Sequence, residues 1–324
     1  MAKAVRIHQP GGPEVLTLEE VEVGNPGEGE IRVSQTTCGL NYIDVYHRSG
    51  LYPLPSLPAV IGMEAAGQVE AVGPGVTDLK EGDRIAYPMV LGAYASERVI
   101  PAWKAVKLPD AISDKTAAAM MLKGLTANYL LRRTYKVHPG DPILVYAAAG
   151  GVGQILCQWG KHLGATVIGC VGSEAKATVA KAAGADHVIN YTTESIPERA
   201  KELTGGEGVA VSYDSIGKAT MNDSIDSLRP FGTYVSYGNA SGKTDPLDIA
   251  ILAPKGSLYA TRPTLATHTS TPDLLREGAE ALFDVVTKGV VEIHVNQSYA
   301  LDDVARAHAD LEARKTTGST ILTV

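Results

Sequence analysis

From residue 139 onward, short apolar segments alternate with segments of helical periodicity, and this alternation constrains the fold more than any other feature. The apolar segments include 143–147, 166–171 and 187–191, and amphipathic segments such as 154–163 lie between them. Strands separated by helices are typical of a parallel, doubly wound sheet. The pattern therefore predicts an α/β protein with such a sheet in residues 125–262.

A glycine-rich turn follows the first of these strands. The segment AAAGGVG (147–153) has the spacing G-x-G-x-x-G, with Ala148 in the first position and Gly150 and Gly153 in the others. Gly150 or Gly151 would let the backbone approach a pyrophosphate, and the next helix would direct its N-terminus at the phosphates. A tight turn without a ligand is the alternative. The position between a strand and a helix favours a dinucleotide site.

The end of the second strand indicates which dinucleotide is bound. NAD sites usually carry an acid about 20 residues after the turn, but this strand ends in Val171, Gly172 and Ser173. Ser173 and Lys176 offer a hydrogen bond and a positive charge to a 2′-phosphate, and Tyr191 could cover the phosphate or the adenine. A solvated lysine with no ligand is the alternative. We predict NADPH.

The first 124 residues follow a different pattern. Segments 3–9, 16–23 and 30–37 alternate or are β-branched, and turn sequences separate them. Strands at this spacing, with no helix between them, predict a small barrel or sandwich. Residues 263–324 are too few to form a domain alone, and we expect them to fold back onto the first 124 residues.

Charge and cysteine content exclude several classes of protein. A net charge of −7 gives no general reason to attract nucleic acid or an anionic membrane. Three cysteines without a C-x-x-C pair exclude a disulfide framework and a cysteine-rich zinc lobe. No stretch approaches the roughly 18 apolar residues of a membrane span, and the N-terminus lacks the apolar region of a secretory signal. We expect a cytoplasmic protein.

One polar cluster can be interpreted in two ways. Within the segment CGLNYIDVYHRSG (38–50), Cys38, Asp44 and His47 lie within ten positions. These residue types could form half of a zinc site, or they could form a polar wall beside an organic cofactor.

The motifs of the whole chain bear on this choice. They are GGPEVL (11–16), GLNYIDVYHRSGLYP (39–53), GMEAAG (62–67), KGLTANYLL (123–131), AAAGGVG (147–153), YDSIG (213–217), YGNASG (237–242) and GSLYATRP (256–263). In their order and spacing the chain resembles the zinc-free quinone oxidoreductase and ζ-crystallin branch of the medium-chain dehydrogenase/reductase superfamily. The resemblance implies a Rossmann domain at 125–262 and a GroES-like catalytic domain, a partly open barrel, formed by 1–124 and 263–324.

The resemblance also bears on the metal. In zinc-dependent relatives the GLNYID segment carries a metal-binding cysteine and GMEAAG a metal-binding histidine, whereas this chain has Asn41 and Met63 there. An amide and a thioether do not replace thiolate and imidazole as zinc ligands, and Asp44 with Glu64 makes a poor zinc site. We predict that no metal is bound and interpret His47 as a surface or hydrogen-bonding histidine.

The implied reaction is hydride transfer from NADPH to a quinone. A quinone is electron-poor and needs no Lewis acid, so amide or phenol hydrogen bonds can stabilise the oxyanion formed on reduction. The candidates for these catalytic contacts are Asn41, Tyr46 and Tyr52. The resemblance also implies cofactor contacts from Tyr42, Ile43, Asp44, Val45, Tyr46, Lys123, Thr126, Tyr129, Gly151, Val152, Ser215, Tyr237, Gly238, Asn239, Thr261, Arg262 and Arg314, beside Gly172, Ser173, Lys176 and Tyr191.

Three alternatives stay open at this point. A reductase of α,β-unsaturated carbonyls would use the same fold and cofactor. A zinc alcohol dehydrogenase would need unusual ligands. Relatives also serve as lens crystallins or bind AU-rich RNA, but the acidic balance and the lack of an interleaved basic and aromatic stretch argue against RNA. We further expect a homodimer joined through an edge of the nucleotide-binding sheet.

Overall fold

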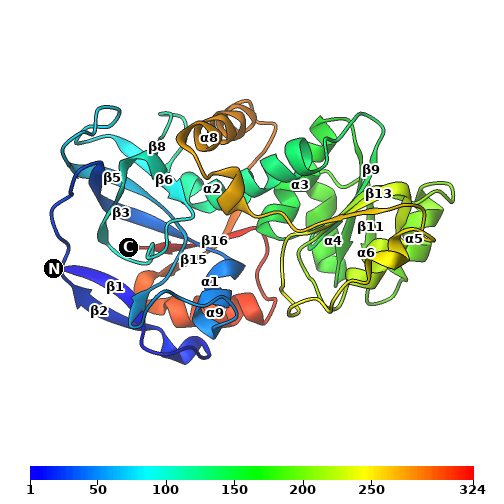
Figure 1. Cartoon of the computed structure of the whole chain (residues 1–324), viewed down its shortest axis with the longest axis horizontal. Coiled ribbons are helices and arrows are strands. Elements are labelled where there is room, and N and C mark those ends of the chain that lie inside the picture. Colours follow the sequence, from blue (N-terminus) through cyan, green and yellow to red (C-terminus); the bar gives the residue numbers. More distant parts are fainter. The chain divides into compact units, whose positions relative to one another are not determined.

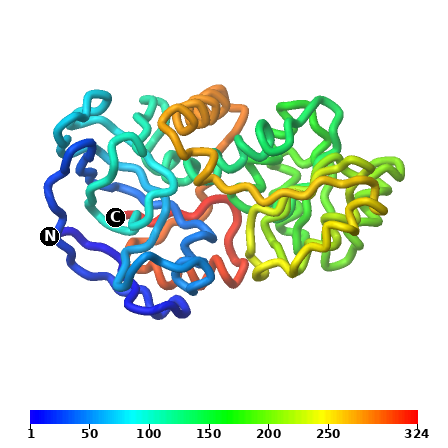
Figure 2. The backbone as a smooth tube through the Cα atoms, viewed as in Figure 1, coloured from blue at the N-terminus to red at the C-terminus, as the bar shows by residue number.

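The computed structural model describes all 324 residues, which form two compact units. The first unit comprises Met1–Leu125, Thr269–Thr287 and Ile293–Val324, and the second comprises Thr126–His268 and Lys288–Glu292. Figures 1 and 2 show that the blue N-terminal and the red C-terminal segments belong to the same unit. The prediction assigned residue 125 to the Rossmann part and residues 263–268 and 288–292 to the GroES-like part, whereas residue 125 belongs to the first unit and the other two segments belong to the second.

The first unit is built on antiparallel strands. Its larger, seven-stranded sheet has the order β15-β16-β3-β5-β6-β8, with β7 also paired to β3, and its smaller sheet has the order β2-β1-β4. All the pairs are antiparallel except β15 with β16. The strands are β1 (Ala2–Ile7), β2 (Thr17–Val21), β3 (Glu30–Leu40), β4 (Ala59–Val60), β5 (Glu64–Val72), β6 (Arg84–Pro88), β7 (Glu97–Pro101), β8 (Val106–Lys107), β15 (Val295–Ala300) and β16 (Ser319–Thr323).

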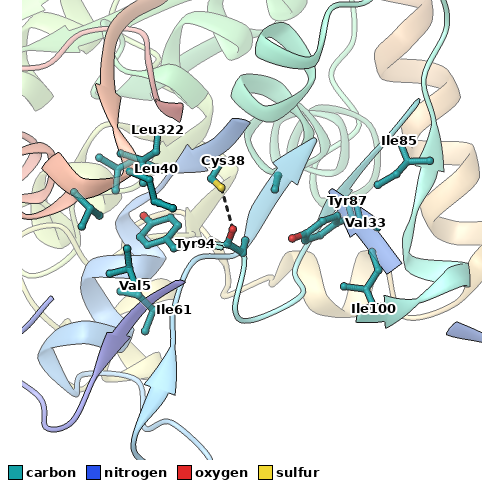
Figure 3. Packing of buried hydrophobic residues seen from close by; sticks show 14 of the residues in the cluster. Val5, Val33, Cys38, Leu40, Ile61, Ile85, Tyr87, Tyr94, Ile100 and Leu322 are labelled. Atoms are coloured by element: carbon teal, nitrogen blue, oxygen red, sulfur yellow. Dashed lines mark hydrogen bonds between the residues drawn. The ribbon is translucent and has the colours of Figure 1, made fainter. Parts of the chain in front are cut away.

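Strand β3 shows how the sequence builds this sheet. Ile31 and Val33 point into one hydrophobic cluster, and so do Cys38 and Leu40. The first pair has odd residue numbers and the second pair even ones, so in a regular strand the two pairs would lie on opposite faces. A register shift between Gln35 and Thr37 explains the change, because one extra residue moves every later side chain to the other face. Val33, Cys38 and Leu40 are seen in this cluster in Figure 3. Burying each such aliphatic side chain contributes roughly 1.5–3 kcal/mol.

The first unit also contains helices, and one of them corrects the expectation that no helix interrupts its strands. That helix is α1 (Tyr42–Ser49), which directly follows β3. The other helical segments are η1 (Pro13–Val15), η2 (Ala102–Lys104), α8 (Pro272–Thr287), η5 (Leu301–Asp303), α9 (Val304–Glu312) and the N-terminal part of α2 (Asp114–Tyr129).

The second unit contains the predicted parallel sheet. Its order is β11-β10-β9-β12-β13-β14, and all of its strand pairs are parallel. Counted along the chain this is the order 3-2-1-4-5-6 of a doubly wound nucleotide-binding sheet, whose switch point lies between β9 and β12. The strands are β9 (Pro142–Tyr146), β10 (Thr166–Val171), β11 (His187–Asn190), β12 (Val209–Asp214), β13 (Leu228–Ser236) and β14 (Tyr259–Thr261).

Helices connect these strands. All six residues of β12 are buried, as expected for a central parallel strand that is covered on both faces. The helical segments are α3 (Gly151–His162), α4 (Glu174–Ala182), α5 (Ile196–Leu203), α6 (Met221–Asp226), η4 (Ile249–Leu252), α7 (Leu265–His268) and η3, a π-helical turn (Leu130–Thr134) that continues α2. No helix in either unit has the length and apolar character needed to cross a membrane.

Candidate functional site

The start of α1 is fixed by a reciprocal contact between Asn41 and Asp44. The Asn41 backbone N–H donates to Asp44 Oδ2 at 2.8 Å, and the Asp44 N–H donates to the Asn41 carbonyl at 3.0 Å. An acid in the first turn satisfies an N–H that the helix leaves unpaired and lies favourably in the helix dipole. These contacts turn the segment after β3 into a helix.

Helix α1 carries an aromatic row. The ring centroids of Tyr42 and Tyr46 lie 6.2 Å apart, and Tyr52 meets Tyr46 edge-on at 5.1 Å. The Tyr42 hydroxyl donates to the Leu311 carbonyl at 3.2 Å, which ties α1 to α9. The structure therefore brings together two of the three predicted catalytic residues, Tyr46 and Tyr52, with Tyr42 beside them.

The third predicted catalytic residue, Asn41, makes specific contacts of its own. Its Nδ2 donates to Glu64 Oε2 at 2.8 Å and to the Gly39 carbonyl at 3.4 Å. Glu64 is fully buried, and it also accepts from Lys123 Nζ at 3.3 Å and from the Leu122 N–H at 2.7 Å. The Asn41 amide thus belongs to a buried polar network in which Lys123 balances the charge of Glu64.

Asp44 is a buried acid with an unusual environment. Its side chain is fully buried, Oδ2 accepts from the Tyr94 hydroxyl at 2.8 Å, and Oδ1 has no hydrogen-bond partner within the protein. Burial raises the pKa of Asp44 to about 7, against the lowering effect of the Tyr94 hydrogen bond. Lys123 lowers this pKa and Glu64 raises it, both through charge. Asp44 therefore titrates near neutral pH.

The potential metal ligands in this region have other roles. Cys38 Sγ donates to the Ala93 carbonyl at 2.9 Å, a contact drawn as the dashed line in Figure 3, and burial raises the pKa of the thiol to about 12. His47 is half-buried with its ring edge-on to Tyr52, and its Nδ1 is buried without a hydrogen-bond partner. Its interpretation as a surface or hydrogen-bonding histidine stays a prediction. No three His, Cys, Asp or Glu side chains are grouped to hold a metal ion.

In the second unit, the glycine-rich turn has the geometry of a phosphate cradle. Gly150 precedes α3, and Gly151 and Val152 form its first turn, where backbone N–H groups lack intrahelical partners. A β-carbon on Gly153 would overlap the Ala147 carbonyl, so glycine is required for this close approach of helix and turn. The cradle presents N–H donors and the positive end of the helix dipole to an anion.

The end of β10 brings together the residues predicted to select NADPH. Ser173 precedes α4, and its Oγ accepts from the Lys176 N–H at 3.3 Å. The Tyr191 hydroxyl lies over Gly172, where any β-carbon would overlap it. The nearest acid, Glu174, accepts a hydrogen bond from the Asn190 amide at 2.8 Å. Glu174 therefore already has a partner within the protein.

A second polar group forms around Tyr129, which is buried. Its ring stacks on His268 with the centroids 4.3 Å apart and an interplanar angle of 3°. Burial raises the pKa of Tyr129, and the charge of Arg262 and a hydrogen bond with Thr126 act in the opposite direction. Arg262 also donates to the Ser236 carbonyl at 2.8 Å. The structure thus gathers Thr126, Tyr129 and Arg262.

The ends of β12 and β13 form the next part of this group. Burial raises the pKa of Tyr237, while a hydrogen bond with Ser215 lowers it. Gly238 packs against the Ser215 backbone so closely that a β-carbon would overlap the carbonyl, and the half-buried Asn239 follows it. These segments follow the carboxyl ends of the strands, where doubly wound sheets bind ligands.

Four other residues were also predicted to contact the cofactor. Val45 is buried, and Ile43 is half-buried on α1. Thr261 is exposed on β14, and Arg314 is exposed with a φ of 58°, close enough to Tyr42 for its charge to lower that tyrosine's pKa against the larger effect of burial. Cofactor roles for all four stay predictions.

Sequence reasoning missed a set of buried residues behind α1. The Tyr94 hydroxyl, which donates to Asp44, also lies 3.2 Å from His308 Nε2, and His308 Nδ1 lies 3.1 Å from Arg48 Nη1. Arg48 reaches Glu312 Oε1 at 2.8 Å. No local pattern indicated this set, because its members come from α1, a loop and α9.

Two family models match separate stretches of the chain. Residues 27–110 match the family model described as the alcohol dehydrogenase GroES-like domain, and residues 151–280 match the model described as zinc-binding dehydrogenase. The predicted GroES-like and Rossmann parts are thereby confirmed. The word zinc in the second description belongs to that family model. This chain has Asn41 and Met63 at the two positions that the sequence resemblance assigns to metal ligands in zinc-dependent relatives.

Full-length relatives give closer matches. The quinone oxidoreductase of Salmonella typhimurium is 53% identical over 99% of both chains. The crystal structure of Escherichia coli quinone oxidoreductase complexed with NADPH has a TM-score of 0.97 and 49% identity, and the match covers 99% of this chain and 100% of that one. The 2-haloacrylate reductase of a Burkholderia species is 47% identical over 99% of both chains.

Proposed function

This chain belongs to the quinone oxidoreductase family of the medium-chain dehydrogenases and reductases, and from that premise we propose that it is an NADPH-dependent quinone reductase that uses no metal. The proposal that the enzyme uses no metal is supported by the environment of Asn41. This residue stands where zinc-dependent relatives carry a cysteine, and its amide nitrogen is hydrogen-bonded to the buried Glu64.

The residues present fit NADPH. When bound, NADPH supplies the hydride from its nicotinamide C4. The N–H groups of Gly151 and Val152 would hold the pyrophosphate. Ser173 and Lys176 would bind the 2′-phosphate, and Tyr191 would cover it.

Further cofactor contacts are proposed on the same basis. In the second unit they come from the Tyr129 group and from the segments after β12 and β13. In the first unit they come from α1 and the neighbouring network. These residues are Thr126, Tyr129, Arg262, Thr261, Ser215, Tyr237, Gly238, Asn239, Tyr42, Ile43, Asp44, Val45, Tyr46, Lys123 and Arg314.

On the acceptor side, we assign hydrogen bonding to Tyr46 and Tyr52, whose rings are in contact. A phenol hydroxyl can stabilise the oxyanion that develops on a quinone as it accepts hydride. Asn41 lies at the head of the same helix, and its bond to Glu64 orients the amide. Solvent water can supply the protons after the reduced quinone is released, so no side chain has to act as an acid.

A reductase of α,β-unsaturated carbonyls is the second candidate, and the similarity to a 2-haloacrylate reductase favours it. The two functions are separated by comparing kcat/KM for 9,10-phenanthrenequinone and for a simple enone at fixed NADPH. We expect the quinone to be reduced faster. Faster reduction of the enone would reverse the choice of substrate and leave the cofactor proposal standing.

We propose that the protein is a homodimer joined at β14. This strand forms one edge of the parallel sheet, and all three of its residues are exposed. Tyr259 is 61% exposed, and Phe231, whose N–H donates to the Gly256 carbonyl just before β14, is 69% exposed. An unpaired apolar edge is a template for strand pairing. Sedimentation should show that the wild-type protein is a dimer. The Tyr259→Lys variant should be a monomer, whereas the control variant Leu18→Lys should remain a dimer.

We also propose a cytoplasmic location, because all three cysteines are buried free thiols, as is usual in a reducing compartment. Cell fractionation with an antibody to the protein would test this, and recovery outside the cytoplasmic fraction would contradict it.

A further inference from the structure

A buried chain of hydrogen bonds runs behind α1 within the first unit. Arg48, His308, Tyr94 and Asp44 are each at most 2% exposed, and they are linked at 3.1, 3.2 and 2.8 Å. Burying this many polar groups costs free energy unless all of them are well paired. This series of hydrogen bonds ends at Asp44, the residue whose Oδ2 fixes the first turn of α1.

The direction of every hydrogen bond in this chain is determined by chemistry. Arginine has only donors, so His308 Nδ1 must accept from Arg48. The proton of the neutral imidazole is then on Nε2, which donates to the Tyr94 oxygen, and the Tyr94 hydroxyl donates to Asp44. Burial and the Arg48 charge lower the pKa of His308 to about 3, which keeps the ring neutral. Every donor therefore points toward the Asp44 carboxyl.

This direction excludes a proton relay to the surface. A relay would have to draw its next proton from Arg48, whose guanidinium does not release one in proteins. The chain is instead an oriented support. It holds Oδ2 of Asp44 in place by one side-chain donor, while Oδ1 has no partner within the protein.

We propose that Tyr94 and His308 are positioning residues for quinone reduction, which act through Asp44 to hold the first turn of α1 and hence the Tyr46 ring in place. The expected loss of quinone reduction rests on the proposed function, whereas the expected loosening of α1 does not. Tyr46 lies on the turn of α1 that follows the cap, so a loosened cap displaces the ring that we assign to hydrogen bonding with the acceptor.

The test compares three variants of the whole enzyme. His308→Leu removes both hydrogen bonds of the ring, and His308→Gln restores an acceptor for Arg48 and a donor for Tyr94. Tyr94→Phe removes only the hydroxyl and keeps the packing of the ring. The readouts are kcat and the quinone KM at saturating NADPH, together with hydrogen–deuterium exchange of the amides in residues 42–49.

We expect His308→Leu and Tyr94→Phe to lower kcat/KM for the quinone about tenfold, as for loss of a hydrogen bond to a charged group. Amide exchange in α1 should become faster, and His308→Gln should recover most of both effects. If folded Tyr94→Phe keeps wild-type kinetics and exchange, or if His308→Gln behaves like His308→Leu, the proposal is wrong. Faster α1 exchange in a protein that reduces no quinone would refute the proposed function and leave the positioning role intact.

Discussion

The hydroxyl of Tyr191 occupies the space in which a side chain at Gly172 would begin, so that a methyl group at Gly172 would overlap it. Gly172 directly follows β10, and its φ lies outside the left-handed region, so the backbone itself would accept alanine. The space that glycine leaves is therefore used by the tyrosine ring. This contact places Tyr191 beside Ser173, at the proposed 2′-phosphate site.

Gly172→Ala should displace Tyr191 and weaken NADPH binding. We expect the KM for NADPH to rise about tenfold, equivalent to about 1.4 kcal/mol. Steady-state kinetics would measure this, with Gly24→Ala as the control, since a β-carbon at Gly24 meets no atom within 4 Å. An unchanged KM would place the phosphate away from Tyr191.

The preference for NADPH over NADH should depend on the tip of β10. Val171→Asp introduces an acid where NAD-dependent enzymes carry one, so it should repel the 2′-phosphate and favour NADH. Lys176→Ala should raise the KM for NADPH more than that for NADH, because only NADPH carries the extra charge. The ratio of kcat/KM for the two cofactors measures both effects, and an unchanged ratio would contradict this assignment.

Lys123 should stabilise the fold through Glu64. The carboxylate is fully buried, and Lys123→Met would leave its charge uncompensated at a cost of about 3–5 kcal/mol in the free energy of unfolding. Urea denaturation would measure this, with the exposed Lys115 on the same helix as the site of a control substitution to Met. The double variant with Glu64→Gln should recover part of the loss. Equal stability of Lys123→Met and the control would show that the pair contributes nothing.

Asp44 should make the stability depend on pH. Its pKa is raised from 3.8 to about 7 in the folded protein, so the folded state holds this proton more tightly than the unfolded state does. The contribution of Asp44 to the free energy of unfolding is therefore fully present below about pH 4, and it is lost as the pH rises through 7. An Asp44→Asn variant keeps the other titratable groups that face this carboxyl, so it is a suitable reference. These groups are Lys123, Tyr94, Glu64 and the neutral thiol of Cys38.

The measurement is Tm against pH for the wild type and for Asp44→Asn. The Tm of the wild type relative to the variant should fall between pH 4 and pH 7 and level off above that range. A difference in Tm that stays constant with pH would show that Asp44 titrates at its ordinary value.

Much of the second unit was predictable because its information is local. A strand, a glycine-rich turn and a helix follow one another between residues 142 and 162, and the tip of β10 is adjacent in sequence to Ser173 and Lys176. Parallel strands align their carboxyl ends, so residues that follow separate strands of this sheet lie at the same edge.

The first unit was less predictable, because its polar contacts join distant segments. Helix α1 depends on the Asp44 cap, and in a region of short strands this cap was not recognised as a helix start. Asn41 was identified as a donor for the substrate, but its partner Glu64 lies on another strand. Tyr94 and His308, 214 positions apart, carry no local signal at all.

The central claim is hydride transfer from NADPH to a quinone without a metal, and one rate comparison tests it most directly. Protein treated with a chelator is mixed with 9,10-phenanthrenequinone and with NADPH carrying deuterium at the transferred C4 position, and oxidation of the nicotinamide is followed by absorbance. We expect oxidation as fast as in the untreated protein, and slower with deuterated than with ordinary NADPH. Failure to oxidise NADPH, or activity that vanishes with the chelator and returns with zinc, would contradict the account.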